Sequence, residues 1–151
     1  MIDLLKVGLL SILPISELRG GIPLGLALGL NPFIVYTVAV LFNFLAVPIV
    51  FFFFDNIHKY FMRNKGYSVF FNNYIHRNRK KIEGSVGKKT EFWALMLLVL
   101  IPLPFTGAYT GSTLAWFFGL KRKEAYIAIF SGVIMAGIIV TIASLGIISL
   151  F

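Results

Sequence analysis

The sequence predicts an all-α integral membrane protein with two inverted repeats, each a re-entrant helical hairpin followed by a transmembrane helix. Hydrophobic residues form 58% of the 151-residue chain, whereas soluble domains contain about 45–50%. Two apolar runs, 33–54 and 125–151, each reach the roughly 20 residues that a helix needs to cross a bilayer. Short and long apolar segments occur in the same order twice, with an amphipathic basic segment joining the two copies.

The first repeat opens with two apolar segments, 4–13 and 24–30, that are too short to cross a bilayer. Between them, Pro14–Pro23 holds a glutamate, an arginine and two adjacent glycines, and glycine and proline interrupt helices. Irregular backbone at membrane depth has to be covered by protein or water. We therefore expect repeat 1 (1–54) to contain a re-entrant hairpin over 4–30 and a transmembrane helix over 32–54.

The connector, residues 55–90, is rich in lysine and arginine. Nine of these residues lie between Asp55 and Glu91, interleaved with aromatic and aliphatic side chains at helical spacing. Such a pattern is typical of a helix in the headgroup region, and the positive-inside rule places the connector and Lys121–Lys123 in the cytoplasm. A basic patch also suits nucleic acid, but beside so much membrane sequence we expect no nucleic-acid partner.

The second repeat (91–151) is expected to form a re-entrant hairpin over 92–120 and a transmembrane helix over 124–150. It echoes the first repeat at a constant offset of 90 residues, and the pairs include Pro14 with Pro104, Ser16 with Thr106 and Gly21 with Gly111. If both basic clusters are cytoplasmic, the two hairpins enter the membrane from opposite faces. Inverted repeats with broken helices that meet near the midplane are typical of secondary transporters.

Two segments, Ile15–Gly25 and Ile101–Ser112, together with Gly119–Ala125, resemble the putative small multidrug export protein family. This family is in turn distantly similar to the DedA (VTT, SNARE-associated) superfamily. The resemblance implies a small transporter of the cell membrane, for which coupling to protons is one expectation. It leaves two alternatives, a DedA-like flippase or scramblase for phospholipid or polyprenyl phosphate, and a membrane assembly factor that transports nothing.

Glu17 is the only acidic residue between Leu4 and Phe54. Burial favours its protonated form and Arg19 favours its ionised form, so this carboxyl group suits proton loading and release. The alternative is a structural ion pair with Arg19 at the hairpin tip. Arg19 is also the best candidate for an anion, through its planar fork of donors, with the backbone of Gly20 and Gly21 nearby. These glycines could equally serve only the turn.

The second apex offers hydroxyl groups in place of charges. They could bind a ligand, or they could cap helix ends freed by proline; the residues are Thr106, Tyr109, Thr110 and Ser112. Asn43, within the first long run, suits a hydrogen bond between helices or a ligand contact. The expected structural breaks are Pro14, Pro23, Pro102, Pro104 and Gly111.

The chain has no cysteine and two histidines, so we expect no metal site and no cofactor. It shows no nucleophile paired with a base, so we expect no enzyme activity. The expected partners are membrane lipids, a proton or a small-molecule or lipid-phosphate substrate, and a second copy of the chain. The small residues of 125–149 are the candidate homodimer face, because small residues allow close helix packing.

Overall fold

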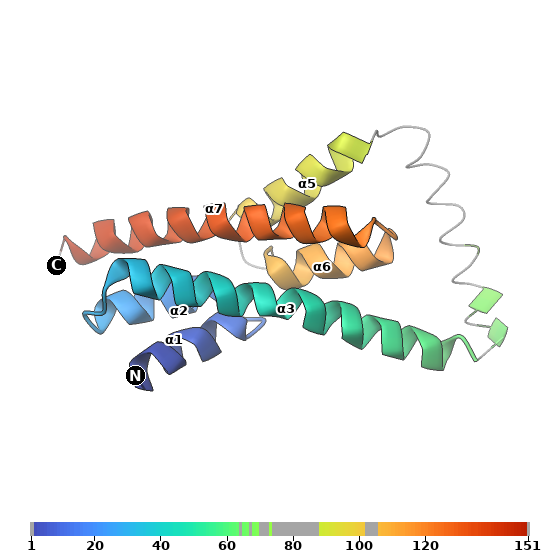
Figure 1. The fold of residues 1–151 in the computed structure, drawn as a ribbon, viewed down its shortest axis with the longest axis horizontal. Coiled ribbons are helices and arrows are strands. Elements are labelled where there is room, and N and C mark those ends of the chain that lie inside the picture. Colours follow the sequence, from blue (N-terminus) through green and yellow to red (C-terminus); the bar gives the residue numbers. More distant parts are fainter. Residues whose placement is uncertain are drawn as a thin grey trace.

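The computed structural model describes residues 2–63, 65, 66, 68, 69, 73, 88–101 and 106–150. Over these residues it contains helices and no strand. The helices, shown in Figure 1, are α1 (Ile2–Ile12), α2 (Glu17–Ala27), α3 (Pro32–Phe61), α5 (Lys88–Leu100), α6 (Ala108–Phe117) and α7 (Arg122–Ile148). Much of the predicted basic connector lies outside the described residues, as do Pro102 and Pro104.

The two long helices, α3 and α7, are apolar enough and long enough to cross a membrane. They run in opposite directions along the molecule (Figure 1). Asn31 fixes the start of α3, because its side chain accepts a hydrogen bond of 2.9 Å from the Phe33 N–H and Pro32 occupies the first turn. α3 continues from its expected end at residue 54 to Phe61, so the first part of the predicted connector belongs to this helix.

The first hairpin consists of α1 and α2, joined by residues 13–16. Its break is shorter than predicted, since Gly20, Gly21 and Pro23 lie inside α2. Pro23 is therefore not a break. A Cβ at Gly21 would lie closer than 3.0 Å to the Ser11 hydroxyl and 2.8 Å from the Val7 carbonyl oxygen. Glycine is needed there for close packing of α2 on α1 rather than for a turn.

The second hairpin consists of α5 and α6, and its break includes Gly107, whose φ is +140°. The prediction that Gly111 is a break is wrong, because this residue lies in the first half of α6. Its Cα faces α5, where an added Cβ would meet the Val99 side chain at 2.6 Å.

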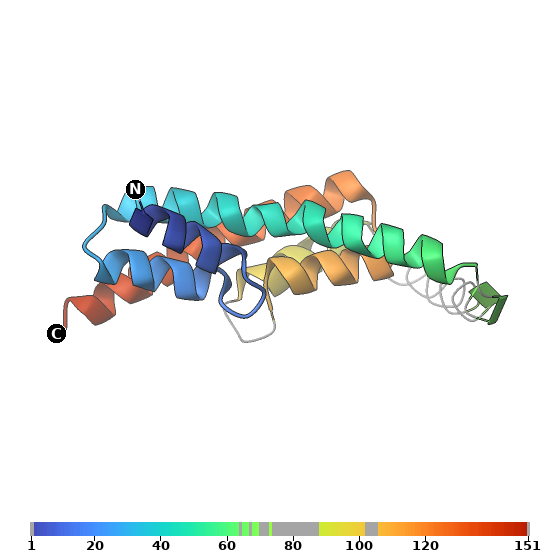
Figure 2. The same cartoon turned by 90° about the horizontal axis from the view of Figure 1, so that it is seen from below.

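The special backbone positions of the two halves are spaced by the same 90 residues. Positive φ angles occur at Glu17 (+46°) and Gly107 (+140°), where each second hairpin helix starts. They occur again at Gly29 (+72°) and Gly119 (+67°), just before each long helix. The two hairpins extend from opposite ends of the molecule (Figures 1 and 2), and the Glu17 side chain at the start of α2 lies against Gly107 at the start of α6.

The two halves are packed into each other, because α2 and α6 each contact both long helices. Glycines of α7 allow α5 and α3 to approach this helix closely. A Cβ at Gly132 would lie 2.8 Å from the Met96 carbonyl oxygen of α5, and one at Gly137 would lie 2.9 Å from the Tyr36 ring of α3. The predicted homodimer face is therefore wrong where it includes these glycines, which are buried inside the chain.

Candidate functional site

Glu17 is the first residue of α2 and is 9% exposed. Its carboxylate accepts a hydrogen bond from the backbone N–H of Tyr109, in the first turn of α6. The N–H groups of a first helical turn have no partner within their own helix and attract negative charge. Glu17 of the first hairpin thus caps a helix of the second hairpin.

This cap depends on Gly107, the residue directly before α6. Gly107 has no side chain with which to cap the helix, and a Cβ there would lie closer than 3.0 Å to the Glu17 carboxylate. Its φ of +140° also favours glycine. Gly107 was not among the predicted site residues, although the offset of 90 pairs it with Glu17.

The positive φ of Glu17 is the only one at a non-glycine residue within the described part of the chain. Backbone conformations of this kind cost about 1–3 kcal/mol, and they persist where surrounding structure enforces them. At this position, the residue turns from the hairpin loop into α2 while its carboxylate lies against α6.

Arg19 also reaches the second hairpin. Its Nη2 donates to the carbonyl oxygen and to the hydroxyl oxygen of Thr106, at 2.8 and 3.0 Å. The Thr106 hydroxyl in turn donates to the Ile101 carbonyl oxygen at 2.6 Å. The ion pairs of the described residues do not include one between Glu17 and Arg19. The alternative of an ion pair closed within the first tip is therefore not what the geometry shows, because the hydrogen bonds of both side chains go to the opposite tip.

Two donors complete the contact at the end of α1. The Tyr109 hydroxyl donates to the Ile12 carbonyl oxygen. The Asn43 side chain, from α3, donates to the Ser11 carbonyl oxygen at 2.9 Å. The last carbonyl groups of a helix lack partners within it, so both donors stabilise the end of α1. Tyr109 of the second hairpin therefore stabilises the end of a helix in the first hairpin, just as Glu17 of the first hairpin stabilises the start of a helix in the second.

The other predicted residues lie in the same helices, and Ser112 and Gly20 make contacts within their own helix. Ser112 is fully buried, and its hydroxyl donates to the Ala108 carbonyl oxygen at 2.6 Å, within α6. An added Cβ at Gly20 would meet the Ser16 hydroxyl of its own turn. Thr110 is partly buried in the first turn of α6. The geometry thus joins Glu17 and Arg19 to Thr106 and Tyr109.

A small internal cavity lies beside these contacts. Glu17, Arg19, Asn43 and Gly107 supply its polar side, and the remaining lining is mostly apolar and includes α5 and α7 side chains. Its volume is about 10 Å³, close to the minimum for one water molecule. A cavity of this size suits exchange of a proton at a carboxyl group and excludes an organic molecule.

A second polar cluster, which the sequence did not lead us to expect, joins α3 to the start of α7. Asp55 accepts a hydrogen bond of 2.9 Å from the Trp116 indole N–H of α6 and another from Arg122. The Arg122 guanidinium also lies 5.4 Å from the centre of the Phe51 ring. Asp55 was placed in the connector. Asp55 directly follows four consecutive phenylalanines, and this position next to apolar sequence could have indicated that its carboxylate binds partners within the protein.

Comparison with known proteins gives a family match. The family model described as putative small multi-drug export protein matches residues 17–139, a range that includes both hairpin contacts. Among curated proteins and among solved structures, no match to the chain is found.

Proposed function

Because the chain belongs to the putative small multi-drug export protein family, we propose that it is a proton-coupled exporter whose pathway runs between two opposed hairpin tips. The observation that carries the proposal is the Glu17 carboxylate capping α6 across the contact between the hairpins. Coupling to protons requires a titratable group whose charge alters the contact between two parts of the protein, which here are the two hairpins.

In this proposal α3 and α7 cross the membrane and each hairpin enters from one face and returns to it. The hairpins extend from opposite ends of the molecule, and the beginning of α1 lies at the same end as the end of α7 (Figure 1). The paired positive φ angles at an offset of 90 support two copies of one unit in opposite orientations. The expected location is the cell membrane with the connector in the cytoplasm.

Protonation of Glu17 would weaken the contact between the hairpins. An ionised carboxylate near a helix N-terminus stabilises it by about 0.3–1 kcal/mol, and by up to about 2 kcal/mol when partly buried. A neutral carboxyl group loses most of this interaction. Proton binding would therefore release α6 from α2, and proton loss would restore the cap. The contact between Arg19 and Thr106 requires no proton and would keep the tips aligned.

The flippase alternative receives less support from the geometry. A phosphate headgroup needs far more room than the cavity beside Arg19 provides. The hydrogen bonds that Arg19 makes are directed to Thr106.

The test is transport of a fluorescent cationic dye in proteoliposomes under imposed pH gradients. We expect Glu17→Gln to abolish the dependence of the dye flux on the gradient, because the amide keeps the shape of the carboxyl group but cannot exchange a proton. The matched control is Asp3→Asn, which neutralises an exposed carboxylate paired with Lys6 on α1. Unchanged gradient dependence in Glu17→Gln would remove the proposed role of this residue.

A further inference from the structure

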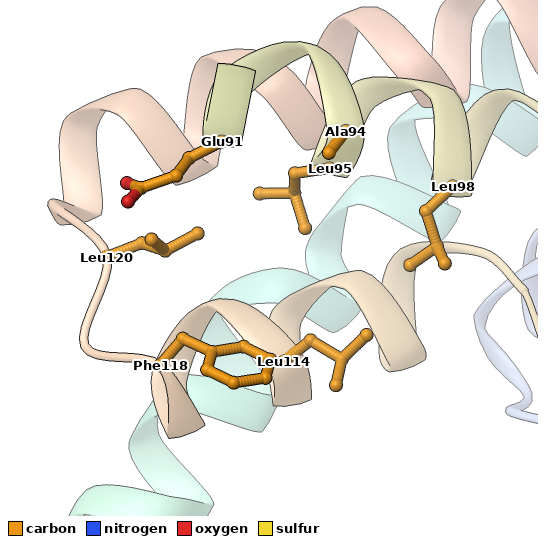
Figure 3. Close-up of a pocket in the computed structure, with 7 residues that line it drawn as sticks. All are labelled: Glu91, Ala94, Leu95, Leu98, Leu114, Phe118 and Leu120. Atoms are coloured by element: carbon orange, nitrogen blue, oxygen red, sulfur yellow. The ribbon is translucent and has the colours of Figure 1, made fainter. Parts of the chain in front are cut away.

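A larger cavity lies within the second hairpin, at the surface between α5 and α6. It has a volume of about 270 Å³, slightly below the lower end of the range typical of small-molecule sites, about 300–1,000 Å³. Figure 3 shows its lining, which consists of one carboxylate and six apolar side chains: Glu91, Ala94, Leu95, Leu98, Leu114, Phe118 and Leu120.

The polar and apolar parts of this cleft are separated. The Glu91 carboxylate lies at one end, near Leu120, and Leu98 lies toward the other end (Figure 3). The Glu91 side chain is partly buried, and the ion pairs among the side chains that the structure describes, which exclude those of residues 88 and 89, do not involve it. A charge beside an apolar wall acts on a nearby ion more strongly than one in bulk water.

From this arrangement we propose that the cleft between α5 and α6 binds amphiphilic organic cations, with the apolar part among the leucines and the cationic centre beside Glu91. The inference rests on the proposed function and names the class of substrate. If the connector is cytoplasmic, Glu91 lies at the cytoplasmic surface of the membrane and the leucines lie deeper. An exporter would collect its substrate from this side.

Charge decides between a cation and a phospholipid as the occupant. The leucine-lined part of the cleft would accept an acyl chain as readily as an aromatic cation. A lipid phosphate at the mouth of the cleft would, however, be repelled by Glu91, because like charges in partly buried sites disfavour each other. In the first hairpin the offset of 90 pairs Glu91 with Met1, and the acidic residue in the first turn of α1, Asp3, is paired with Lys6.

The experiment compares two ions of nearly the same shape and opposite charge. Binding of tetraphenylphosphonium and of tetraphenylborate to the purified full chain is measured by equilibrium dialysis, with protein-free detergent as the blank. We expect tetraphenylphosphonium to bind at least tenfold more tightly. Glu91→Gln should weaken its binding by about tenfold, which corresponds to about 1.4 kcal/mol. The matched control Glu124→Gln, which removes an acidic residue outside the cleft, should leave binding unchanged.

A second variant tests the apolar part of the site. Ala94→Trp keeps Glu91 but fills the cleft, and position 94 is exposed, so the fold tolerates the larger side chain. We expect it to weaken tetraphenylphosphonium binding by at least tenfold. Equal binding of the two ions, or binding insensitive to both Glu91→Gln and Ala94→Trp, would overturn the inference.

The failure of this inference is distinguishable from failure of the proposed function. If transport depends on protons and on Glu17, but tetraphenylphosphonium binding is unchanged in Glu91→Gln, the binding site in the cleft is refuted and the exporter function is retained. If binding requires Glu91 but the unmodified chain transports no dye, the binding site is retained and the exporter function is refuted.

Discussion

The two helices of the first hairpin pack closely on each other, whereas the two helices of the second hairpin leave a cleft between them, although both hairpins have the same order of elements. In the first, glycines at 20, 21 and 25 lie along α2, and Gly21 and Gly25 contact α1 side chains closely. In the second, the equivalent positions are Thr110, Gly111 and Ala115. Here α5 and α6 approach at Gly111 and then diverge (Figure 1), leaving the 270 Å³ cleft. The hairpin whose second helix has more glycines is thus the one whose two helices leave no cleft of this kind between them.

The hairpins also differ in the chemistry that each contributes where they meet. The first supplies both charged side chains, Glu17 and Arg19. The second supplies backbone groups, namely the N–H of Tyr109 and the carbonyl oxygen of Thr106, as well as their hydroxyl groups. Because the two charged side chains bind separate groups of the second hairpin, a proton bound to Glu17 would weaken its contact with α6 and leave the contact between Arg19 and Thr106 in place.

Substitution of Gly107 should have the largest effect on this contact. We expect Gly107→Ala to lower the free energy of unfolding by about 2–5 kcal/mol, because it combines a clash with the Glu17 carboxylate and an unfavourable φ. Thermal unfolding in detergent measures the loss. Gly29→Ala is the matched control, because Gly29 has a positive φ but no atom near an added Cβ. Equal losses in the two variants would show that the Glu17 contact contributes nothing.

Alanine at the paired positions Gly21 and Gly111 tests the difference in packing between the two hairpins. We expect Gly21→Ala to destabilise the chain by about 1–3 kcal/mol, because the new Cβ meets the Val7 carbonyl oxygen, which is backbone and cannot rotate away. Gly111→Ala meets a methyl group of the buried Val99 side chain, and a side chain can shift where backbone cannot. The gain from removing glycine's backbone freedom, about 1 kcal/mol in either helix, should therefore offset more of the clash at Gly111 than at Gly21. Chemical unfolding curves would contradict this comparison if Gly111→Ala were the worse variant.

Thr106→Val should have the smallest effect of the three. It removes the hydroxyl that accepts one of the Arg19 hydrogen bonds and donates to the Ile101 carbonyl oxygen, but it leaves the Thr106 carbonyl oxygen as an acceptor for Arg19. We expect a loss of about 1 kcal/mol in unfolding free energy and retained dependence of transport on the pH gradient. Loss of that dependence in Thr106→Val would mean that Arg19, rather than Glu17, controls the coupling.

Much of the site was visible in the sequence because charge within apolar segments is rare. Glu17 and Arg19 were predicted for this reason, and the repeat at an offset of 90 predicted that Thr106 and Tyr109 lie in the equivalent apex. The pairing of these residues was not predictable. Sequence proximity suggested that Glu17 binds Arg19, whereas residues two apart on a helix do not face each other. The start of α2 at Glu17 turned both side chains toward the second hairpin.

The sequence by itself determined the all-helical membrane class, the two long spans and the repeated order of elements, because apolar length and composition are local properties of the chain. The tertiary structure decided where the helices break and what each glycine does. Pro23 and Gly111 were expected breaks but lie inside helices, while Gly107 makes room for Glu17. Space around a Cα depends on the neighbouring helix, which no local pattern in the sequence specifies.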